Sequence, residues 1–275
     1  MSPTELAQRD SAALAAKQIT EMFGGDTGIQ IPVDAPLPQI KILRETPQYE
    51  MPDGTTVKSF IGNILYWHNA NQFYNVEFGD GENGPPVCAS SNGIVPDGGT
   101  NPYTGPCRTC LKNQYGSDIK GGKGKACQNT IRLYVLVDGE ILPCVIKASP
   151  ASLSPKDSLV RWLTNAPNIA AKAGIGTKYQ PIVVKFSLHT KTFDQYSASC
   201  IDIETVRVLK PLDDGQGAFY DDDADKLRRL ARLYQDFMAN YLGRIKHDVG
   251  AETTHAQEGQ PDQGDGFPDD NLPDF

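Results

Sequence analysis

Hydrophobic and polar residues alternate through the middle of the chain, and this pattern predicts a β-rich core. Between residues 56 and 210 several runs repeat with a period of two, as in strands that have one buried and one solvated face. In one such run Val184 and Phe186 fall on the buried side, whereas Lys185 and Lys191 fall on the solvated side. We therefore expect strands that are buried on one face only.

Turn-forming residues divide this region into individual strands. The pattern predicts strands at 39–45, 57–68, 72–78, 130–137, 141–148, 181–192 and 196–209. Asn69-Ala70-Asn71 would turn the second strand into the third as a hairpin, and Asp138-Gly139 is a favoured two-residue turn between the next two. The strands would thus be mostly antiparallel.

Three helices are expected beside the strands. Ser2 and Glu5 form the capping start of a helix that would end after Phe23. A second helix should begin after Ser154, and a third should span 220–247, with acidic residues at its start and basic residues at its end. The apolar stripe of the third helix would pack on the β core or, alternatively, mediate a homo-oligomer.

The order of these elements predicts an α+β fold that is mainly β with flanking helices. Strands, a helix and two further strands are the order of a five-stranded oligonucleotide/oligosaccharide-binding (OB) barrel, although a mixed sheet capped by helices fits nearly as well. The expected parts are an N-terminal helix and extended arm (1–55), an OB-type core (56–210) with an inserted loop (88–127), a C-terminal helix (211–247) and a disordered acidic tail (248–275).

Composition narrows the class of protein. The chain has no run of about 18 apolar residues and no basic, apolar leader, so we expect a cytoplasmic protein without membrane contact. Six cysteines in 275 residues are too few for a disulfide-based scaffold. Cys144 and Cys200 stand in apolar, strand-like runs and are expected to be ordinary core residues.

The net charge of −8 is distributed unevenly along the chain. Residues 101–210 carry 15 basic and 7 acidic side chains, whereas residues 248–275 carry no basic and 8 acidic side chains. Local patches rather than the overall sign decide whether a polyanion is attracted. The basic middle is therefore a candidate surface for nucleic acid.

Four cysteines lie in a loop that is rich in glycine and poor in apolar residues. Cys107 and Cys110 are separated by two residues, a spacing that lets one turn present both sulfurs to one ion, and Cys88 and Cys127 stand further away on either side. A loop of this composition cannot order itself by hydrophobic burial. We therefore expect a structural Zn²⁺ held by four thiolates; the alternative is a loop with ordinary reduced thiols.

Basic and aromatic side chains in the loop and strands favour binding of single-stranded nucleic acid. Lysines neutralise phosphates, and aromatic rings offer faces on which bases stack. Arg132 and Tyr134 share one face of a strand, opposite Leu133, and we expect that face to be solvated. The side chains expected to contact DNA are Lys112, Lys120, Lys123, Lys125, Arg132, Tyr134, Trp67, Tyr74, Lys185 and Lys191.

Signals for catalysis are poor. The run at 121–125 has no Ser or Thr after its lysine and is not a phosphate-binding loop. The four histidines have no metal-ligand spacing, and a four-thiolate site leaves no open position for a catalytic water. We expect a protein that is not an enzyme. The alternatives are a zinc-bearing nuclease or primase accessory, and a protein-docking adaptor in transcription or recombination.

The C-terminal residues resemble the acidic, Phe-terminated tip of bacterial and phage single-stranded DNA-binding proteins. The resemblance is carried by the last seven residues, and the stretch from Cys88 to Tyr134 is similar to phage or mobile-element proteins of that kind. It implies a protein of a bacterial cell or phage-infected host that coats DNA during replication or recombination. It also implies that the tip recruits partner enzymes and competes with DNA, through Asp269, Asp270, Leu272, Asp274 and Phe275.

The chain departs from the bacterial pattern in two respects. The ordinary bacterial protein lacks the cysteine loop and ends in Pro-Phe, whereas this chain ends in Pro-Asp-Phe. The oligomer formation and host-partner recognition of the bacterial proteins therefore cannot be assumed for this chain. The hypothesis from sequence is a single-stranded DNA-binding protein with an OB-type barrel, a structural zinc and an acidic tail.

Overall fold

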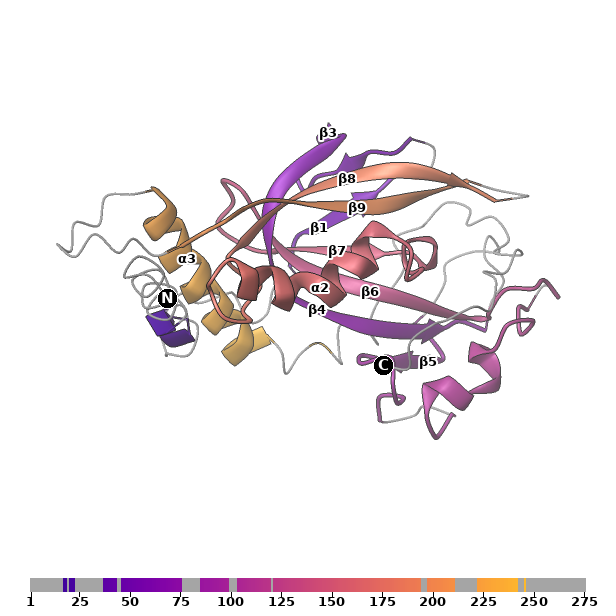
Figure 1. Ribbon diagram of the computed structural model, residues 1–275. Coiled ribbons are helices and arrows are strands. Elements are labelled where there is room, and N and C mark those ends of the chain that lie inside the picture. Colours follow the sequence, from indigo (N-terminus) through magenta and orange to yellow (C-terminus); the bar gives the residue numbers. More distant parts are fainter. Residues whose placement is uncertain are drawn as a thin grey trace.

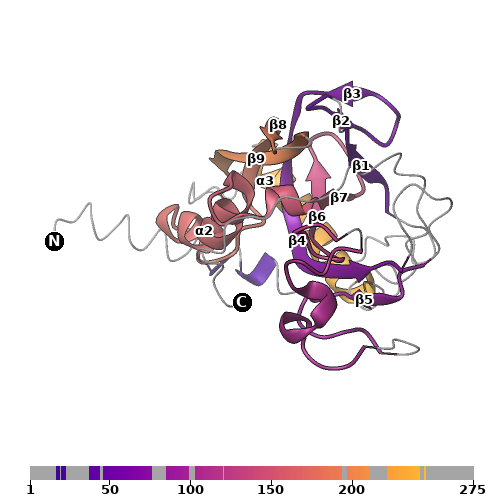
Figure 2. The same cartoon turned by 90° about the vertical axis from the view of Figure 1, so that its right-hand side faces the viewer.

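The protein is mainly β, with a curled sheet that forms a half-barrel and a few helices around it (Figures 1 and 2). The computed structural model describes residues 17–18, 20–22, 37–43, 46–75, 85–98, 103–119, 121–193, 197–210, 222–241 and 245. The expected α+β class is confirmed at this level. Of the helix expected over residues 2–23, the described residues 17–18 and 20–22 are helical, and the rest lies outside the described ranges.

Nine strands form one sheet in the order β3-β2-β1-β7-β6-β4-β8-β9, with β5 paired to β4. The strands are β1 (Gln39–Ile42), β2 (Tyr49–Glu50), β3 (Thr56–Val57), β4 (Ser59–Phe73), β5 (Cys88–Ser90), β6 (Cys127–Val137), β7 (Cys144–Ala148), β8 (Ile182–Thr192) and β9 (Ser197–Val208). The helices are the 3₁₀ turns η1 (Cys107–Thr109), η2 (Leu111–Asn113) and η3 (Pro150–Ser152), the α-helices α2 (Ser158–Lys172) and α3 (Asp222–Asp236), and the π-helix η4 (Phe237–Tyr241).

β4 organises the sheet because it pairs antiparallel with three other strands. Its first residues pair with β8, nearly its whole length pairs with β6, and its last residues pair with β5. The hairpin expected at 69–71 is wrong: Asn69 and Asn71 continue the strand opposite Ile131 and Asn129. Asn71 also donates a side-chain hydrogen bond to the Gly93 carbonyl at 3.1 Å, so tertiary contacts outweigh the turn preference of asparagine.

A bulge in β4 changes which side chains face inward. The register with β6 shifts between Ile64 and Tyr66. Before the shift Phe60 and Ile64 face the interior, whereas after it Trp67 does and Tyr66 packs with a separate cluster on the other face. An extra residue in one strand has this effect, because side chains otherwise alternate strictly.

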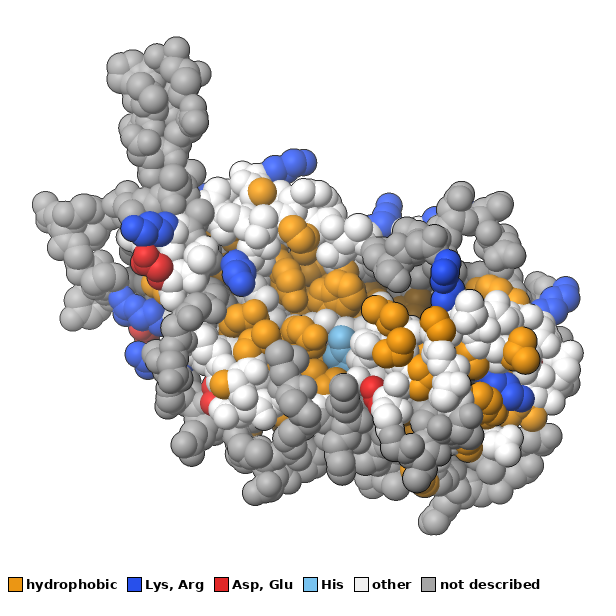
Figure 3. Space-filling view, turned by 90° about the horizontal axis from the view of Figure 1, so that it is seen from below, with side chains coloured by type: hydrophobic (Ala, Val, Ile, Leu, Met, Phe, Trp, Pro, Cys, Tyr) orange, Lys and Arg blue, Asp and Glu red, His pale blue; other side chains and the backbone are white. Residues whose placement is uncertain are grey.

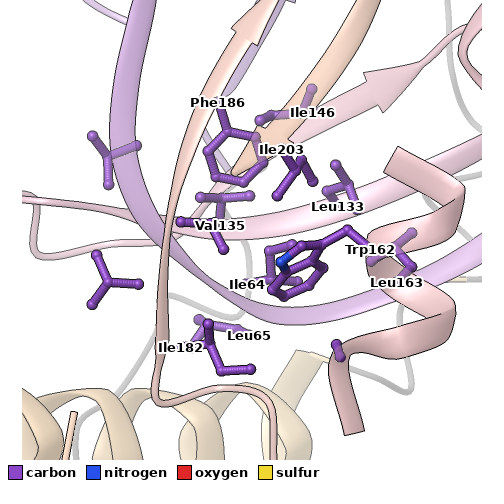
Figure 4. Close-up of a cluster of buried hydrophobic side chains, with 14 of the residues drawn as sticks. Ile64, Leu65, Leu133, Val135, Ile146, Trp162, Leu163, Ile182, Phe186 and Ile203 are labelled. Carbon is purple, nitrogen blue, oxygen red and sulfur yellow. The ribbon is translucent and has the colours of Figure 1, made fainter. Parts of the chain in front are cut away.

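The main core fills the concave side of the half-barrel (Figure 4). Phe186 on β8 is fully buried and stacks on Phe60 with 4.8 Å between ring centroids, and Tyr49 meets Phe60 edge-on at 5.0 Å. Helix α2 adds Leu159 and Trp162, and the Trp162 indole N–H donates to the Thr205 hydroxyl of β9 at 2.9 Å. The helix expected after Ser154 is confirmed, and its buried face attaches it to β9.

Hydroxyl groups cover the outer edge of β9 where a barrel would place another strand. The Ile201 N–H donates to the Ser152 hydroxyl at 3.1 Å, and the Ile203 N–H donates to the Ser158 hydroxyl at 3.0 Å. The Ser158 hydroxyl in turn donates to the Ile203 carbonyl. η3 and the first turn of α2 therefore satisfy an edge that would otherwise be open to pairing with another chain.

The N-terminal strands bring the two ends of the curled sheet together. β1 pairs parallel with β7, and the Ser199 hydroxyl of β9 donates to the Leu43 carbonyl just after β1 at 2.9 Å. The Tyr49 hydroxyl donates to the Ser187 carbonyl of β8 at 3.1 Å. The strands of residues 39–50 thus lie in the same sheet as the core strands. No helix within the described ranges is long and apolar enough to cross a membrane.

Candidate metal and nucleic-acid-binding site

The cysteine loop, residues 88–127, leaves the sheet at the end of β4 and returns at the start of β6. Cys88 begins β5 and Cys127 begins β6, and both are register partners of Phe73 on opposite sides of β4. Residues that share a register position on neighbouring strands point to the same face of a sheet. The sheet therefore places the two outer cysteines on one face, although 38 residues separate them in sequence.

The inner pair of cysteines lies in a tight turn. η1 begins at Cys107, and the Cys110 N–H donates to the Cys107 carbonyl at 3.3 Å. The Asn113 side-chain amide donates to the same carbonyl at 2.9 Å, and the Gln114 amide donates to the Cys110 carbonyl at 3.2 Å. Side chains from the following turn thus hold the backbone that positions both thiols.

All four thiols line one small cavity of about 20 Å³. Such a volume is enough for one water-sized species. Burial, together with the charges of the sulfurs of Cys88, Cys107 and Cys110, raises the pKa of the Cys127 thiol to about 12. Four thiols in one apolar cavity repel each other when ionised, and a soft divalent cation removes that repulsion.

The chemistry of this donor set fits zinc. Within the described residues, however, no group of three or more His, Cys, Asp and Glu side chains could hold a metal ion as it stands. The four thiols that line the cavity are of the kind that zinc takes as sulfur ligands. Cys144 and Cys200, by contrast, are buried in the sheet away from the cysteine loop, as expected for core residues.

Two lysines of the cysteine loop lie over aromatic rings. The Lys112 ammonium is 5.2 Å from the centroid of Phe73, and the Lys125 ammonium is 4.6 Å from the centroid of Tyr115. Lys123 is exposed between them in sequence, and Lys120 lies outside the described residues. Phe73 is buried at the end of β4, so Tyr115, which is 39% exposed, is the ring that the loop presents beside a cation. A cation beside an exposed aromatic face is the combination that binds single-stranded nucleic acid without sequence preference.

The side of β4, β6 and β7 opposite the main core, here called the outer face, carries Arg132 and Tyr134. The expectation that this face is solvated is wrong, because Arg132 is 4% and Tyr134 is 2% exposed. Phe237 and Tyr241 of η4 cover Tyr134, with ring centroids 4.8 and 5.7 Å away. The apolar stripe expected for the C-terminal helix is thus divided: its last residues are buried on the outer face, whereas Leu227 and Leu230 pack in the main core.

Other residues expected to contact DNA are separated in space. Trp67 is half-buried against the main core, and Tyr74 is 7% exposed. Lys185 is exposed on β8 between Ile61 and Glu204 of the neighbouring strands. At the far end of β8, Lys191 lies 3.5 Å from an Asp157 carboxylate oxygen and 5.6 Å from the Phe193 ring centroid. The tail residues Asp269, Asp270, Leu272, Asp274 and Phe275 lie outside the described residues.

Tyr66 and His68 are outer-face residues that strict alternation did not single out. Tyr66 is the register partner of Tyr134, and the Tyr134 hydroxyl donates to the His68 Nε2 at 3.2 Å, while His68 Nδ1–H donates to the Asn69 carbonyl. Burial lowers the pKa of His68, so the ring is neutral at pH 7. The sequence did contain a signal for them: Tyr66 and His68 are two residues apart on one strand, as Arg132 and Tyr134 are on the strand that pairs with it.

The lower surface of the molecule gathers many hydrophobic side chains, with Lys and Arg side chains along its border (Figure 3). The described large hydrophobic residues that are exposed include six from residues 87–119, and Leu111 is 82% exposed. This surface can present apolar and cationic contacts to a ligand. No family model, curated protein or solved structure matches the chain. Its function is therefore inferred from the geometry of the site.

Proposed function

We propose that the chain is a single-stranded DNA-binding protein built on an OB-type barrel. The pairing pattern supports this: β4 pairs with both β6 and β8, β6 continues to β7, β8 continues to β9, and α2 lies between β7 and β8 in sequence. In an OB barrel the first strand likewise pairs with the second and fourth, and a helix stands between the third and fourth. The β9 edge, covered by η3 and α2, then takes the place of the closing strand pair.

A structural zinc ion would hold the cysteine loop in its binding conformation. Cys88, Cys107, Cys110 and Cys127 would be the ligands, and four thiolates complete a tetrahedral site. The ion would serve to order the loop and has no part in catalysis in this proposal. In an OB barrel the loop between the first two strands is one of those that contact oligonucleotides, and the cysteine loop stands at that position.

The observation that carries the proposal is the exposed ring of Tyr115 beside Lys125 on this loop, with further lysines close to it in sequence. Lys112, Lys123 and Lys125 would neutralise phosphates, and Tyr115, which is 39% exposed beside Lys125, would stack on a base. Binding of this kind has little sequence preference and weakens strongly with salt. It suits a protein that coats and protects single strands during replication or recombination.

Removing the loop lysines tests this observation. We expect a chain with Lys112, Lys123 and Lys125 replaced by glutamine to lose a large part of its affinity for oligo-dT, with the slope of log K against log salt smaller by about 2. A matched control is Lys41→Gln, which removes a lysine paired with Glu50 between β1 and β2, outside the cysteine loop. Equal salt slopes for the triple variant and the control would contradict the role of the loop. Titration of labelled oligo-dT by fluorescence anisotropy measures the slopes.

The acidic tail would compete with DNA for the basic middle of the chain. Asp269, Asp270, Leu272, Asp274 and Phe275 would also recruit replication or recombination enzymes. We expect a chain that ends at His247 to bind oligo-dT several-fold more tightly at low salt, because eight carboxylates near a basic surface compete with phosphate. Raising the salt should remove the difference, since screening weakens this competition. Affinity that does not change on truncation would count against competition by the tail.

A second candidate function is a protein-docking adaptor. The exposed hydrophobic side chains of the cysteine loop, among them Ile94 at 57% and Leu111 at 82%, favour it. An adaptor would keep its zinc and would show no length-dependent binding to oligonucleotides. That result separates it from a protein that coats DNA.

A further inference from the structure

The outer face combines aromatic, imidazole and cationic side chains. Tyr66 is opposite Tyr134 and His68 is opposite Arg132 in the register of β4 and β6, and Lys147 of β7 is opposite Arg132. The Tyr66 and Tyr134 ring centroids are 6.0 Å apart, and His68 stacks on Tyr134 at 5.8 Å. Charged and polar groups of this kind are rare in a face that serves only packing. They are the groups that surfaces for single-stranded nucleic acid use.

Two aromatic rings of η4, those of Phe237 and Tyr241, pack on this face. The Phe237 centroid is 4.8 Å from Tyr134 and 5.9 Å from Tyr66, and the Tyr241 centroid is 5.7 Å from Tyr134. These separations are typical of attractive aromatic pairs. Phe237 and Tyr241 thus take the place over the tyrosines that stacked bases would take.

η4 can be separated from the helix that precedes it. Leu227 and Leu230 of α3 belong to the main core, and Lys226 makes an ion pair with Asp138 at 3.2 Å. Phe237 and Tyr241 belong instead to the cluster on the outer face. The helix changes from α to π between these two sets, and π-helical turns are rare and often mark functional sites. Release of η4 would therefore leave the anchor of α3 in place.

We propose that η4 is a displaceable cover that occupies the outer face in place of DNA bases, and that single-stranded DNA competes with it for Tyr66 and Tyr134. The inference rests on the proposed function. It adds that η4 regulates the access of DNA to this face. In the covered state DNA meets the lysines and Tyr115 of the cysteine loop. Displacement of η4 extends the stacking surface from that loop along β4 and β6.

The test compares oligo-dT binding by the full chain and by the double variant Phe237→Ala, Tyr241→Ala. The variant lacks the competing rings, so we expect it to bind about tenfold more tightly, because a cover that is closed most of the time lowers the apparent affinity by the open fraction. The matched control is Leu159→Ala, which removes a fully buried core side chain of α2 and should leave affinity unchanged. Adding Tyr134→Ala to the double variant should abolish the gain.

Hydrogen exchange of the unaltered chain gives a second readout that needs no variant. Saturating oligo-dT should speed amide exchange in residues 237–241 while exchange in α3 stays slow. Protection of residues 237–241, or equal or weaker binding by the double variant, overturns the cover while leaving DNA binding intact. Absence of oligo-dT binding by every form, the unaltered chain included, overturns the proposed function itself and the cover with it.

Discussion

If the cysteine loop holds zinc as proposed, replacing Cys107 and Cys110 together with serine is expected to abolish zinc binding and to disorder the loop. The two thiols share one turn and one cavity with Cys88 and Cys127, so two remaining ligands are too few to hold the ion. Since the loop has little apolar surface of its own to bury, the proposed ion would be what orders it. We expect zinc content to fall from about one per chain to near zero, measured by metal analysis of the purified protein.

The free energy of unfolding should fall when the proposed zinc ion is removed. A ligand present at a thousandfold excess over its dissociation constant stabilises the folded state by about 4 kcal/mol, and a chelator removes that stabilisation. The matched controls are Cys144→Ala and Cys200→Ala, which truncate buried thiols outside the loop and should keep the zinc. Full zinc content in the double serine variant would show that the ion is bound elsewhere or that the loop is held by another means.

Replacing Phe186 with alanine will destabilise the half-barrel by about 3–5 kcal/mol, a large share of the total stability of a domain. Phe186 is fully buried, stacks on Phe60, and comes from a strand that joins β4 to β9. The cavity left behind lies where β8 and β4 meet, so neighbouring side chains cannot easily collapse into it. Equilibrium unfolding in urea measures the change.

The matched control for this change is Leu111→Ala. Leu111 is 82% exposed on the cysteine loop, so its truncation should change the free energy of unfolding by less than about 0.5 kcal/mol. A loss below about 1 kcal/mol for Phe186→Ala would contradict the central place of β8 in the core, because truncating a buried phenylalanine normally costs several times more.

Much of the β framework could be predicted from the alternation of residues. The strands expected at 181–192 and 196–209 agree with β8 and β9 within two residues, and the helix after Ser154 is present. These elements have long, regular patterns and clear boundaries. The strand at 141–148 is shorter than expected, since β7 begins at Cys144.

The errors have local physical causes. Asn69 and Asn71 carry a turn preference that long-range pairing with β6 overrides. The bulge after Ile64 reverses the alternation, so no strict period could place Tyr66 and Trp67 on their correct faces. Such shifts depend on the partner strand, which a single run of sequence does not specify.

The candidate site, too, could be predicted from the sequence only in part. The spacing of Cys107 and Cys110 predicted a shared turn, and the register of Cys88 and Cys127 about Phe73 shows how the outer pair reaches the same cavity. The burial of Tyr134 under η4 depends on a helix about 100 residues later in the chain. No local pattern around a residue reveals a cover that comes from so far along the sequence.

The most direct test of the central claim is titration of labelled oligo-dT with the purified chain at two salt concentrations, with zinc assayed in the same sample. Trp67 and Trp162 face the main core, so the label belongs on the DNA. We predict saturable binding that tightens with oligonucleotide length and weakens at the higher salt. No binding at low salt, in a sample that retains its zinc, would contradict the DNA-binding function and favour the protein-docking adaptor.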